Sequence, residues 1–332
     1  MNDRPASTSR QRSLKDQVGN RETVKSNLGI HRFAITVACL TVVLLAAGAL
    51  VTSNEAGDSV PDWPLSFGRW LVSKDHFVAN VRYEYSHRFL AGIVGVTTLL
   101  LAVWAWFAER RAWVRKLALL AFAGVVAQAI IGGVRVHFPE YKALIAVPHA
   151  LVAQSFFGAV VAIAVFTSRG WLAQREVRLD AGNPSLRTLS AITVAAVLVQ
   201  LVLGAGFRHQ AFGIAPHIVG AVAVASLIIW TSVVVFRRHK GDAYLTRPAR
   251  LAAILVVLQL GLGIAAYFAR LASAGDPQPL EPMISLTVAH LMVGALTLAT
   301  MIVLTLRSHK ALAALNVTGN RAPASPVRRA II

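Results

Sequence analysis

The chain alternates between long apolar runs and short polar connections over most of its length. Eight runs are long enough to cross about 30 Å of hydrocarbon as a helix that rises 1.5 Å per residue. The runs cover approximately residues 33–52, 88–108, 117–135, 144–167, 188–207, 212–236, 250–269 and 284–306. None of them carries a run of charges, so the pattern predicts eight transmembrane helices.

The composition supports this interpretation. Of the 332 residues, 56% are hydrophobic and only 14% are charged, which is typical of a multi-span membrane protein. The predicted fold class is an all-α polytopic membrane protein. The single cysteine, Cys39, lies inside the first run, so the sequence excludes an intramolecular disulfide and a cysteine metal site.

Lysine and arginine gather in the two tails and in every second connection. The other connections hold only Arg69, Lys74, Arg82, Arg135, Lys142, Arg208 and Arg270. Short cytoplasmic loops carry the excess of positive charge in membrane proteins, so both termini are predicted to be cytoplasmic. This bias explains most of the net charge of +18, and we expect membrane lipid rather than nucleic acid as the surrounding partner.

The first 31 residues lack the pattern of a cleavable signal peptide. They contain Asp3, Asp16 and Glu22, whereas organelle transit peptides are poor in acids. The sequence therefore predicts a multi-pass protein of the bacterial inner membrane.

A repeat runs through the eight predicted helices. Three odd-numbered runs contain a glutamine four residues before a glycine, and the first run has a glycine at a similar height: Gln128 and Gly132, Gln200 and Gly204, Gln259 and Gly263, and Gly48. Each even-numbered run has a histidine near its start: His87, His149, His217 and His290. The repeat predicts two pseudo-symmetric four-helix bundles, residues 32–175 and 185–306, between cytoplasmic tails at 1–31 and 307–332.

The four histidines are predicted to lie at one depth, because the even-numbered helices all run in the same direction. Ionisable groups inside membrane helices are costly and usually functional. Two imidazoles from facing helices can hold a haem iron, and the small residues near the histidines leave room for a macrocycle. We expect one haem per half, with iron held by His87 and His149 in the first and by His217 and His290 in the second. Zinc is the competing metal, but it prefers ligands that are close together, and no two of these histidines share a helix.

Four arginines fall at the same end of the predicted helices as the histidines. They are Arg88, Arg135, Arg208 and Arg270. Guanidinium groups at this height could pair with haem propionates, or they could snorkel to the membrane interface.

An acid distinguishes the first half from the second. Glu84 precedes His87 by three residues and shares its helix face, whereas the corresponding positions hold Ala146, Ile214 and Thr287. A carboxylate in this place could move protons or stabilise positive charge. It could also favour the helix dipole or pair with a nearby arginine. The first outer loop is the longest, and a lid over the first haem site is one interpretation of it.

Several motifs resemble the haem A synthase family, which includes bacterial and mitochondrial enzymes of cytochrome oxidase assembly. The motifs are GALVTSNEAG, PDWPLSFG, EYSHR, and the PH, PH and AH starts of the last three even-numbered runs. The resemblance implies that a methyl group of haem O is oxidised by successive hydroxylations to the formyl group of haem A. It further implies that Glu84 is the catalytic carboxylate, that His87 and His149 frame the substrate haem, and that His217 and His290 bind a haem b cofactor.

The resemblance also implies partners. A haem O synthase would act upstream and cytochrome oxidase assembly would receive the product, while a homo-oligomer is left open. This chain lacks the cysteine pair that some bacterial members have in the first outer loop, and Thr52 stands where an arginine is frequent. Two other functions remain as alternatives: a di-haem b cytochrome that transfers electrons from quinol, and a small-molecule transporter built from repeated halves.

Overall fold

The structure is a computed structural model that describes residues 28–180, 182–275 and 280–314. Most of the predicted tails, 1–31 and 307–332, lies outside the described residues. Eight long helices occupy the described part of the chain, and each is long and apolar enough to cross a membrane. They are α2 (Leu28–Ser53), α3 (Val81–Ala108), α4 (Ala112–His137), α5 (Lys142–Thr167), α7 (Leu186–Arg208), α8 (Ala215–Arg238), α9 (Ala243–Ala272) and α10 (Glu281–Ala311). The predicted class, an all-α polytopic membrane protein, is confirmed.

Short elements connect these helices. They are η1 (Lys74–His76), η2 (Pro139–Tyr141), α6 (Arg169–Leu172), β1 (Arg178–Asp180) and β2 (Leu312–Ala314). The two strands pair in parallel, with Arg178 opposite Leu312. The carboxylate of Asp180 accepts hydrogen bonds from the backbone N–H groups of Leu186 and Arg187, which satisfies free donors at the start of α7.

Most of the helices extend beyond the apolar runs that predicted them. Helix α3 begins at Val81, seven residues before the predicted run, and α10 continues to Ala311. The polar ends of these helices lower the local hydropathy without interrupting the backbone hydrogen bonds. One prediction started too early: α8 begins at Ala215 rather than 212, with Pro216 in its first turn, where proline is favoured.

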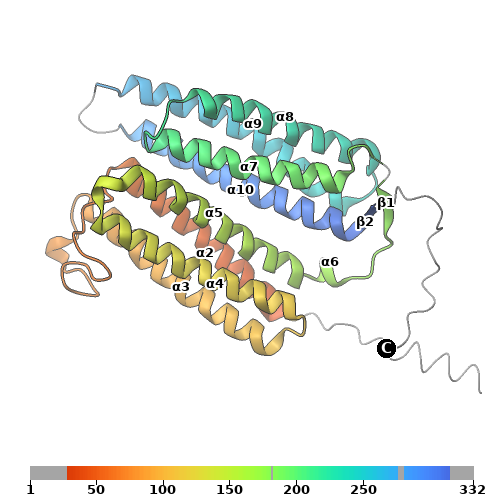
Figure 1. Ribbon diagram of the computed structural model, residues 1–332, viewed down its shortest axis with the longest axis horizontal. Helices are drawn as coiled ribbons and strands as arrows, with labels where there is room; N and C mark the ends of the chain where they lie inside the picture. The colour runs from red at the N-terminus through yellow and green to blue at the C-terminus, as the bar shows by residue number, and fades with distance from the viewer. Residues whose placement is uncertain (1–27, 181, 276–279, 315–332) are drawn as a thin grey trace, which may run out of the picture.

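The helices form two neighbouring groups that run roughly parallel (Figure 1). Buried apolar side chains form one cluster within α2–α5 and another within α7–α10. Helix α10 contacts α2 and α5, and α5 also contacts α7, so these four helices join the halves. Two statements stay predictions: that the halves are related by pseudo-symmetry, and that both termini lie on the cytoplasmic side of the membrane.

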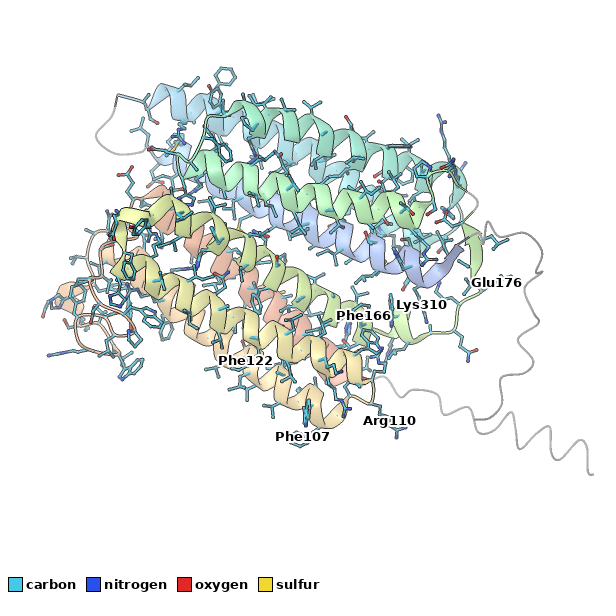
Figure 2. All side chains as sticks on the ribbon, viewed as in Figure 1. Phe107, Arg110, Phe122, Phe166, Glu176 and Lys310 are labelled. Atoms are coloured by element: carbon cyan, nitrogen blue, oxygen red, sulfur yellow. The ribbon has the colours of Figure 1, made fainter. Side chains whose placement is uncertain are left out.

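The two ends of the molecule differ. The loop of residues 54–80 lies at one end, which we call the loop end, and β1 and β2 lie at the other (Figure 1). The outer surface between the ends is apolar, as contact with lipid requires; Phe107 points outward from the end of α3 (Figure 2). The hydroxyl groups of Thr98 and Thr193 are buried between the helices rather than on this apolar surface. Each donates a hydrogen bond to a carbonyl one turn earlier in its own helix.

Candidate functional site: a shared cavity with two histidine pairs

A cavity of about 1930 Å³ occupies the loop end of the molecule. All eight long helices and the loop of residues 54–80 contribute to its lining, and the four histidines predicted as ligands all lie in its wall. Ordinary ligand pockets have volumes of about 300–1,000 Å³, so this cavity has room for more than one ligand of that size. The two halves therefore share one continuous space.

Each histidine ring packs against a glycine of the preceding long helix. A Cβ atom placed on Gly48 would lie 3.0 Å from Cε1 of His87, and Cβ atoms on Gly204 and Gly263 would lie 3.0 and 2.9 Å from Cε1 of His217 and His290. The contact between Gly132 and His149 is looser, at 3.8 Å. These four contacts account for the glycine of the sequence repeat, because a larger residue would displace the ring.

The glutamines of the repeat hold the histidines of the second half. The Nε2 atom of Gln200 lies 2.9 Å from Nδ1 of His217 and also donates to the carbonyl of that residue. The Nε2 atom of Gln259 lies 3.2 Å from Nε2 of His290, and the Gln259 carbonyl lies 3.1 Å from Nδ1 of His290. The orientation of both rings is thus fixed by hydrogen bonds.

The first half lacks these ring contacts. Gln128 donates to the carbonyl of His149 at 2.8 Å, and Leu44 stands where the repeat would place a fourth glutamine. No side chain of the described residues contacts the ring nitrogens of His87 or His149, although the ring of His87 faces the backbone of Leu44 on α2. Buried polar atoms are normally paired, so the buried, unpartnered Nδ1 atom of His149 in a cavity wall points to a missing ligand.

The histidine pair of the second half fits haem iron better than zinc. The ring centres of His217 and His290 lie 6.3 Å apart with an angle of 78° between the ring planes. Metal–imidazole bonds of about 2.0–2.1 Å on opposite sides of one ion would put the ring centres roughly 6 Å apart. Within the described residues, no group of three or more His, Cys, Asp or Glu side chains could hold a metal ion. A tetrahedral zinc site needs such a group, whereas a porphyrin supplies four ligands of its own.

Glu84 is buried, with 4% of its surface exposed, and it lines the cavity. Its Oε1 atom lies 2.5 Å from the guanidinium of Arg88, and its Oε2 atom accepts a hydrogen bond of 2.9 Å from the backbone N–H of Val60. Arg82 interacts instead with the hydroxyl of Tyr83. The predicted pairing of Glu84 with a neighbouring arginine is therefore present and involves Arg88, and the carboxylate also holds the loop of residues 54–80.

Arg88 fastens the same loop through its backbone. The guanidinium donates to the carbonyls of Asp62, Leu65 and Val60 at 2.5, 3.2 and 3.1 Å. Trp63 packs against Gly133 of α4, where a Cβ atom would lie 2.5 Å from the indole ring. The loop covers the cavity at the first half, which supports its interpretation as a lid.

The carboxylate of Asp62 fixes the turn of this loop. It accepts hydrogen bonds of 2.7 Å from the backbone N–H groups of Phe67 and Gly68. Burial raises the pKa of this carboxyl, but these two hydrogen bonds and the charge of Arg88 outweigh burial and lower the pKa below its ordinary value.

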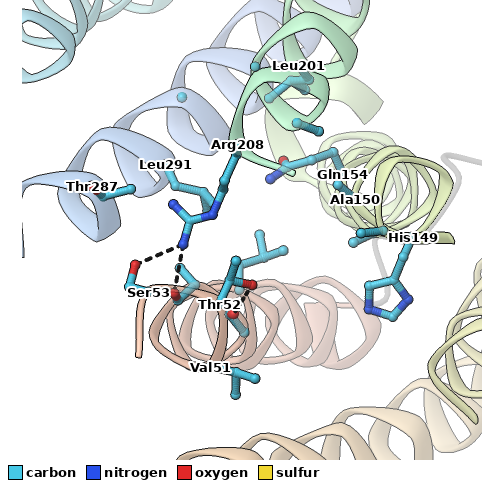
Figure 3. Close-up of a pocket in the computed structure, with 18 of the residues that line it drawn as sticks. Val51, Thr52, Ser53, His149, Ala150, Gln154, Leu201, Arg208, Thr287 and Leu291 are labelled. Atoms are coloured by element: carbon cyan, nitrogen blue, oxygen red, sulfur yellow. Dashed lines mark hydrogen bonds between the residues drawn. The ribbon is translucent and has the colours of Figure 1, made fainter. Parts of the chain in front are cut away.

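The other three candidate propionate arginines also line the cavity. Arg135 donates to the carbonyl of Gly57 at 2.8 Å, and Arg270 lies over the ring of Phe207 at 5.0 Å. Arg208 reaches from α7 to α2, where it donates to the Ala49 carbonyl at 3.0 Å and to the Ser53 hydroxyl at 2.8 Å. Figure 3 shows this guanidinium directed at Ser53 and joining the two halves across the cavity. Contact with propionates stays a prediction for all four arginines.

One cavity residue was not expected from the sequence. His209 follows Arg208 at the end of α7 and lines the cavity. Burial lowers the pKa of His209 to about 4, and the positive charges of Arg208 and Arg135 add to this effect. The sequence signal that could have found it is its position directly after the fifth apolar run. Among the other histidines, His76, His137 and His309 are exposed, whereas His239 is buried.

The fold and the cavity define a polytopic membrane protein with a histidine pair in each half. The chain belongs to the cytochrome oxidase assembly protein family (COX15-CtaA), whose family model matches residues 31–216. This finding confirms the family that the motifs predicted. The matched span covers the first half and ends one residue before His217.

Curated relatives carry the name heme A synthase. The protein of Alkalihalophilus pseudofirmus is 30% identical over 133 residues, which are 39% of this chain and 43% of the relative. The protein of Geobacillus kaustophilus is 32% identical over 126 residues, 37% of this chain and 39% of the relative. These two alignments therefore span less than half of each relative. The protein of Bacillus mycoides aligns over 72% of this chain and 85% of its own length at 23% identity.

Proposed function

We propose that the protein is a haem A synthase of the bacterial cell membrane, which oxidises a methyl group of haem O to the formyl group of haem A. Family membership and the printed names of the relatives support the reaction. The observation that carries the proposal is the first-half site, where a buried carboxylate and two imidazoles without side-chain partners line one cavity.

In this proposal the first half binds the substrate. His87 and His149 hold haem O in the cavity whose wall they line, and no side chain of the described residues contacts their ring nitrogens. The lid that Arg88 holds over the site excludes water from the reacting methyl group. As the resemblance to the family implies, two monooxygenase-type hydroxylations would convert the methyl group to a gem-diol, which loses water to give the formyl group. Each hydroxylation would insert one oxygen atom of O2 and reduce the other to water with two electrons from an external donor.

Glu84 is the proposed catalytic residue. As a carboxylate beside the substrate it can accept, hold or return a proton while the methyl carbon is oxidised. Its hydrogen bonds to Arg88 and Val60 fix its position, so little reorganisation is needed during the reaction. Glu55 is the other carboxylate among the described residues that line the cavity. It is exposed, and it does not share the contacts with Arg88 and Val60 that fix Glu84.

The second half is proposed to hold the cofactor. His217 and His290 would bind haem b, which supplies one-electron redox chemistry when it is bound. Gln200 contacts Nδ1 of His217, and the backbone carbonyl of Gln259 contacts Nδ1 of His290, so both rings are held with Nε2 as the atom that would bind iron. The side-chain amide of Gln259, 3.2 Å from Nε2 of His290, would turn away when the iron binds. A haem O synthase as donor and cytochrome oxidase assembly as recipient are part of the proposal.

A di-haem b cytochrome is the second candidate, and one observation favours it. The contacts of Glu84 with Arg88 and Val60 give this carboxylate a structural task in the lid. A cytochrome that only transfers electrons would need no further role for it. A transporter is less well supported, because the ionisable side chains of the cavity gather at the loop end, and the middle of the helices contributes only neutral polar groups such as Gln154 and Thr297.

The decisive experiment is expression in a host that makes haem O but no haem A, followed by extraction and chromatography of the haems. The proposal predicts a new haem with a formyl group, and it predicts only haem O from cells with the Glu84→Gln variant. A folded protein with bound haem b that leaves haem O unchanged would favour the cytochrome instead.

A further inference from the structure

An arginine of the second half holds the end of a helix in the first half. Arg208 lies in the last turn of α7, and its Nη2 atom donates to the carbonyl of Ala49 at 3.0 Å and to the hydroxyl of Ser53 at 2.8 Å. Both acceptors belong to α2 and are buried. The guanidinium therefore joins α7 to α2 across the cavity, as Figure 3 shows.

This contact gives α2 a positive charge that its own sequence lacks. Three other helices that end in the cavity wall carry an arginine in their last turn: Arg135 in α4, Arg208 in α7 and Arg270 in α9. Helix α2 has no basic residue in its last turn. The carbonyl groups at the end of a helix carry partial negative charge, so a cation there is favourable. Arg208 supplies this cation to α2 from the other half.

The segment of α2 that Arg208 holds also supports the ring of His87. Ala49 directly follows Gly48, where a Cβ atom would lie 3.0 Å from Cε1 of His87. The ring also faces the backbone of Leu44, about one turn earlier in α2. A shift of the end of α2 would therefore move the surface against which His87 packs.

The other end of this bridge lies close to a histidine of the second half. Gly204 precedes Arg208 by one turn of α7, and a Cβ atom on this glycine would lie 3.0 Å from Cε1 of His217. The closely packed helix pairs between the halves are α10 with α2 and α5, and α5 with α7. Helices α2 and α7 are joined by the side chain of Arg208 instead. One side chain thus connects the surfaces that support His87 and His217.

The bridge also lies directly before the lid. Ser53 is the last residue of α2, and the lid begins at residue 54. Helices of the first half hold the lid further along, where Arg135 donates to Gly57 and Arg88 donates to Asp62. Arg208 adds an anchor from the second half at the point where the lid leaves α2.

We propose that Arg208 is a positioning residue of the first-half site, although it belongs to the second half. It holds α2 so that the ring of His87 and the start of the lid keep their places. This inference rests on the proposed function, because it takes His87 as a ligand of the substrate haem. It does not depend on the predicted contact of Arg208 with a propionate, since both hydrogen bonds to α2 come from Nη2 and leave Nη1 and Nε for other partners.

The test compares variants of the full-length protein in lipid nanodiscs. Arg208→Met removes both hydrogen bonds and the charge, whereas Arg208→Lys keeps a cation that can donate to α2. Ser53→Ala removes one acceptor. Arg270→Met is the matched control, because Arg270 also lines the cavity from the last turn of its helix but lies over Phe207 of its own half.

Haem O is titrated into each variant, and absorbance gives its affinity for the first-half site. Arg208→Met should lower this affinity about tenfold and Ser53→Ala about threefold, as expected for the loss of two hydrogen bonds and of one. Arg208→Lys should recover part of the loss. The double variant of Arg208→Met and Ser53→Ala should bind haem O as well as Arg208→Met alone, because both substitutions remove the same contact. Arg270→Met should change the affinity by less than about twofold.

A spectroscopic signal separates positioning from a general loss of stability. The electron paramagnetic resonance of a ferric haem responds to the orientation of its axial imidazoles. The difference between samples with and without haem O gives the signal of the haem at His87. This signal should shift in Arg208→Met, return towards that of the wild type in Arg208→Lys, and stay unchanged in Arg270→Met.

Three results would overturn the inference. The first is a wild-type affinity and a wild-type signal in Arg208→Met. The second is an equal loss of affinity in Arg208→Met and Arg270→Met, because the charge in the cavity would then matter rather than the contact with α2. The third is a double variant in which the two losses add, since Arg208 and Ser53 would then act independently.

The same samples separate this role from the reaction. Wild-type protein that makes haem A, together with an Arg208→Met variant that binds haem O normally, would refute the positioning role and leave the synthase standing. Wild-type protein that binds haem O without converting it, together with weakened binding in Arg208→Met, would refute the synthase and support the positioning role. Wild-type protein that binds no haem O would refute both.

Discussion

In the second half, glutamine amides contact the ring nitrogens of both histidines, whereas in the first half no side chain of the described residues contacts the ring nitrogens of His87 or His149. The first half adds a lid and a buried carboxylate, and the second half has neither among its described residues. One helix arrangement can therefore serve two purposes. Rings held by side chains suit a cofactor that stays bound, and rings without such contacts suit a substrate that is exchanged.

The largest expected effect comes from Glu84. Replacing it by glutamine removes the proton acceptor but keeps the shape, so conversion of haem O should fall by about 100-fold or more while haem b stays bound. The ratio of haem A to haem O in extracts measures this effect. The Arg88→Met variant is the control for the lid. An equal loss of conversion in both variants would mean that Glu84 acts only by holding the loop.

The glycine contacts give the next largest effect. A methyl group at Gly263 would lie 2.9 Å from the ring of His290, whereas one at Gly132 would lie 3.8 Å from the ring of His149. Gly263→Ala should therefore weaken haem b binding about tenfold, and Gly132→Ala should change the binding of haem O by less than about twofold. Titration of each haem into the purified variants tests this. Equal effects of the two substitutions would show that the contacts do not position the rings.

The glutamines should have a smaller effect that differs between the halves. Gln200→Leu removes the contact with the ring of His217, so the reduction potential of haem b should shift and its affinity should fall about tenfold. Gln128 contacts only the carbonyl of His149 among the described groups, so Gln128→Leu should change the affinity for haem O by less than about threefold. Potentiometric titration followed by absorbance measures the first effect. A potential that does not respond to Gln200→Leu would contradict the assigned role.

The smallest effect concerns the junction between the halves at His209. Its folded-state pKa of about 4 lies below the ordinary value of 6.5, so the unfolded chain binds a proton more readily. Stability should therefore decrease as the pH falls from about 6.5 towards 4, and His209→Gln should reduce this dependence. Thermal unfolding of both proteins between pH 7.5 and 4.5 measures the difference. Parallel curves over this range would contradict the burial of His209.

The positions of the helices could be predicted because crossing a membrane requires about 20 apolar residues, and this requirement is visible in any window of the sequence. The polar start of α3, from Val81 to His87, was missed because hydropathy does not register hydrogen bonds. The repeats of histidine and glycine were visible in the sequence, but the packing of each glycine against a histidine ring was not predicted from it. The contacts of the lid could not be predicted, because Arg88 binds backbone carbonyls and every residue has a backbone carbonyl.

Comparison of the halves by register revealed more than either half alone. Histidine is common to both, so it could not distinguish the two sites. Glu84, together with the absence of a glutamine contact on the rings of His87 and His149 among the described residues, distinguishes them. The position of Arg208 between α7 and α2 became visible only in the folded structure, because its partners Ala49 and Ser53 are about 160 residues away in the chain.

The central claim is that each half binds a different haem. The most direct measurement is the haem content of purified His87→Ala and His217→Ala variants from cells that make both haem O and haem b. The account predicts that His87→Ala loses haem O and keeps haem b, and that His217→Ala loses haem b. Loss of the same haem from both variants would contradict the division of the protein into a substrate half and a cofactor half.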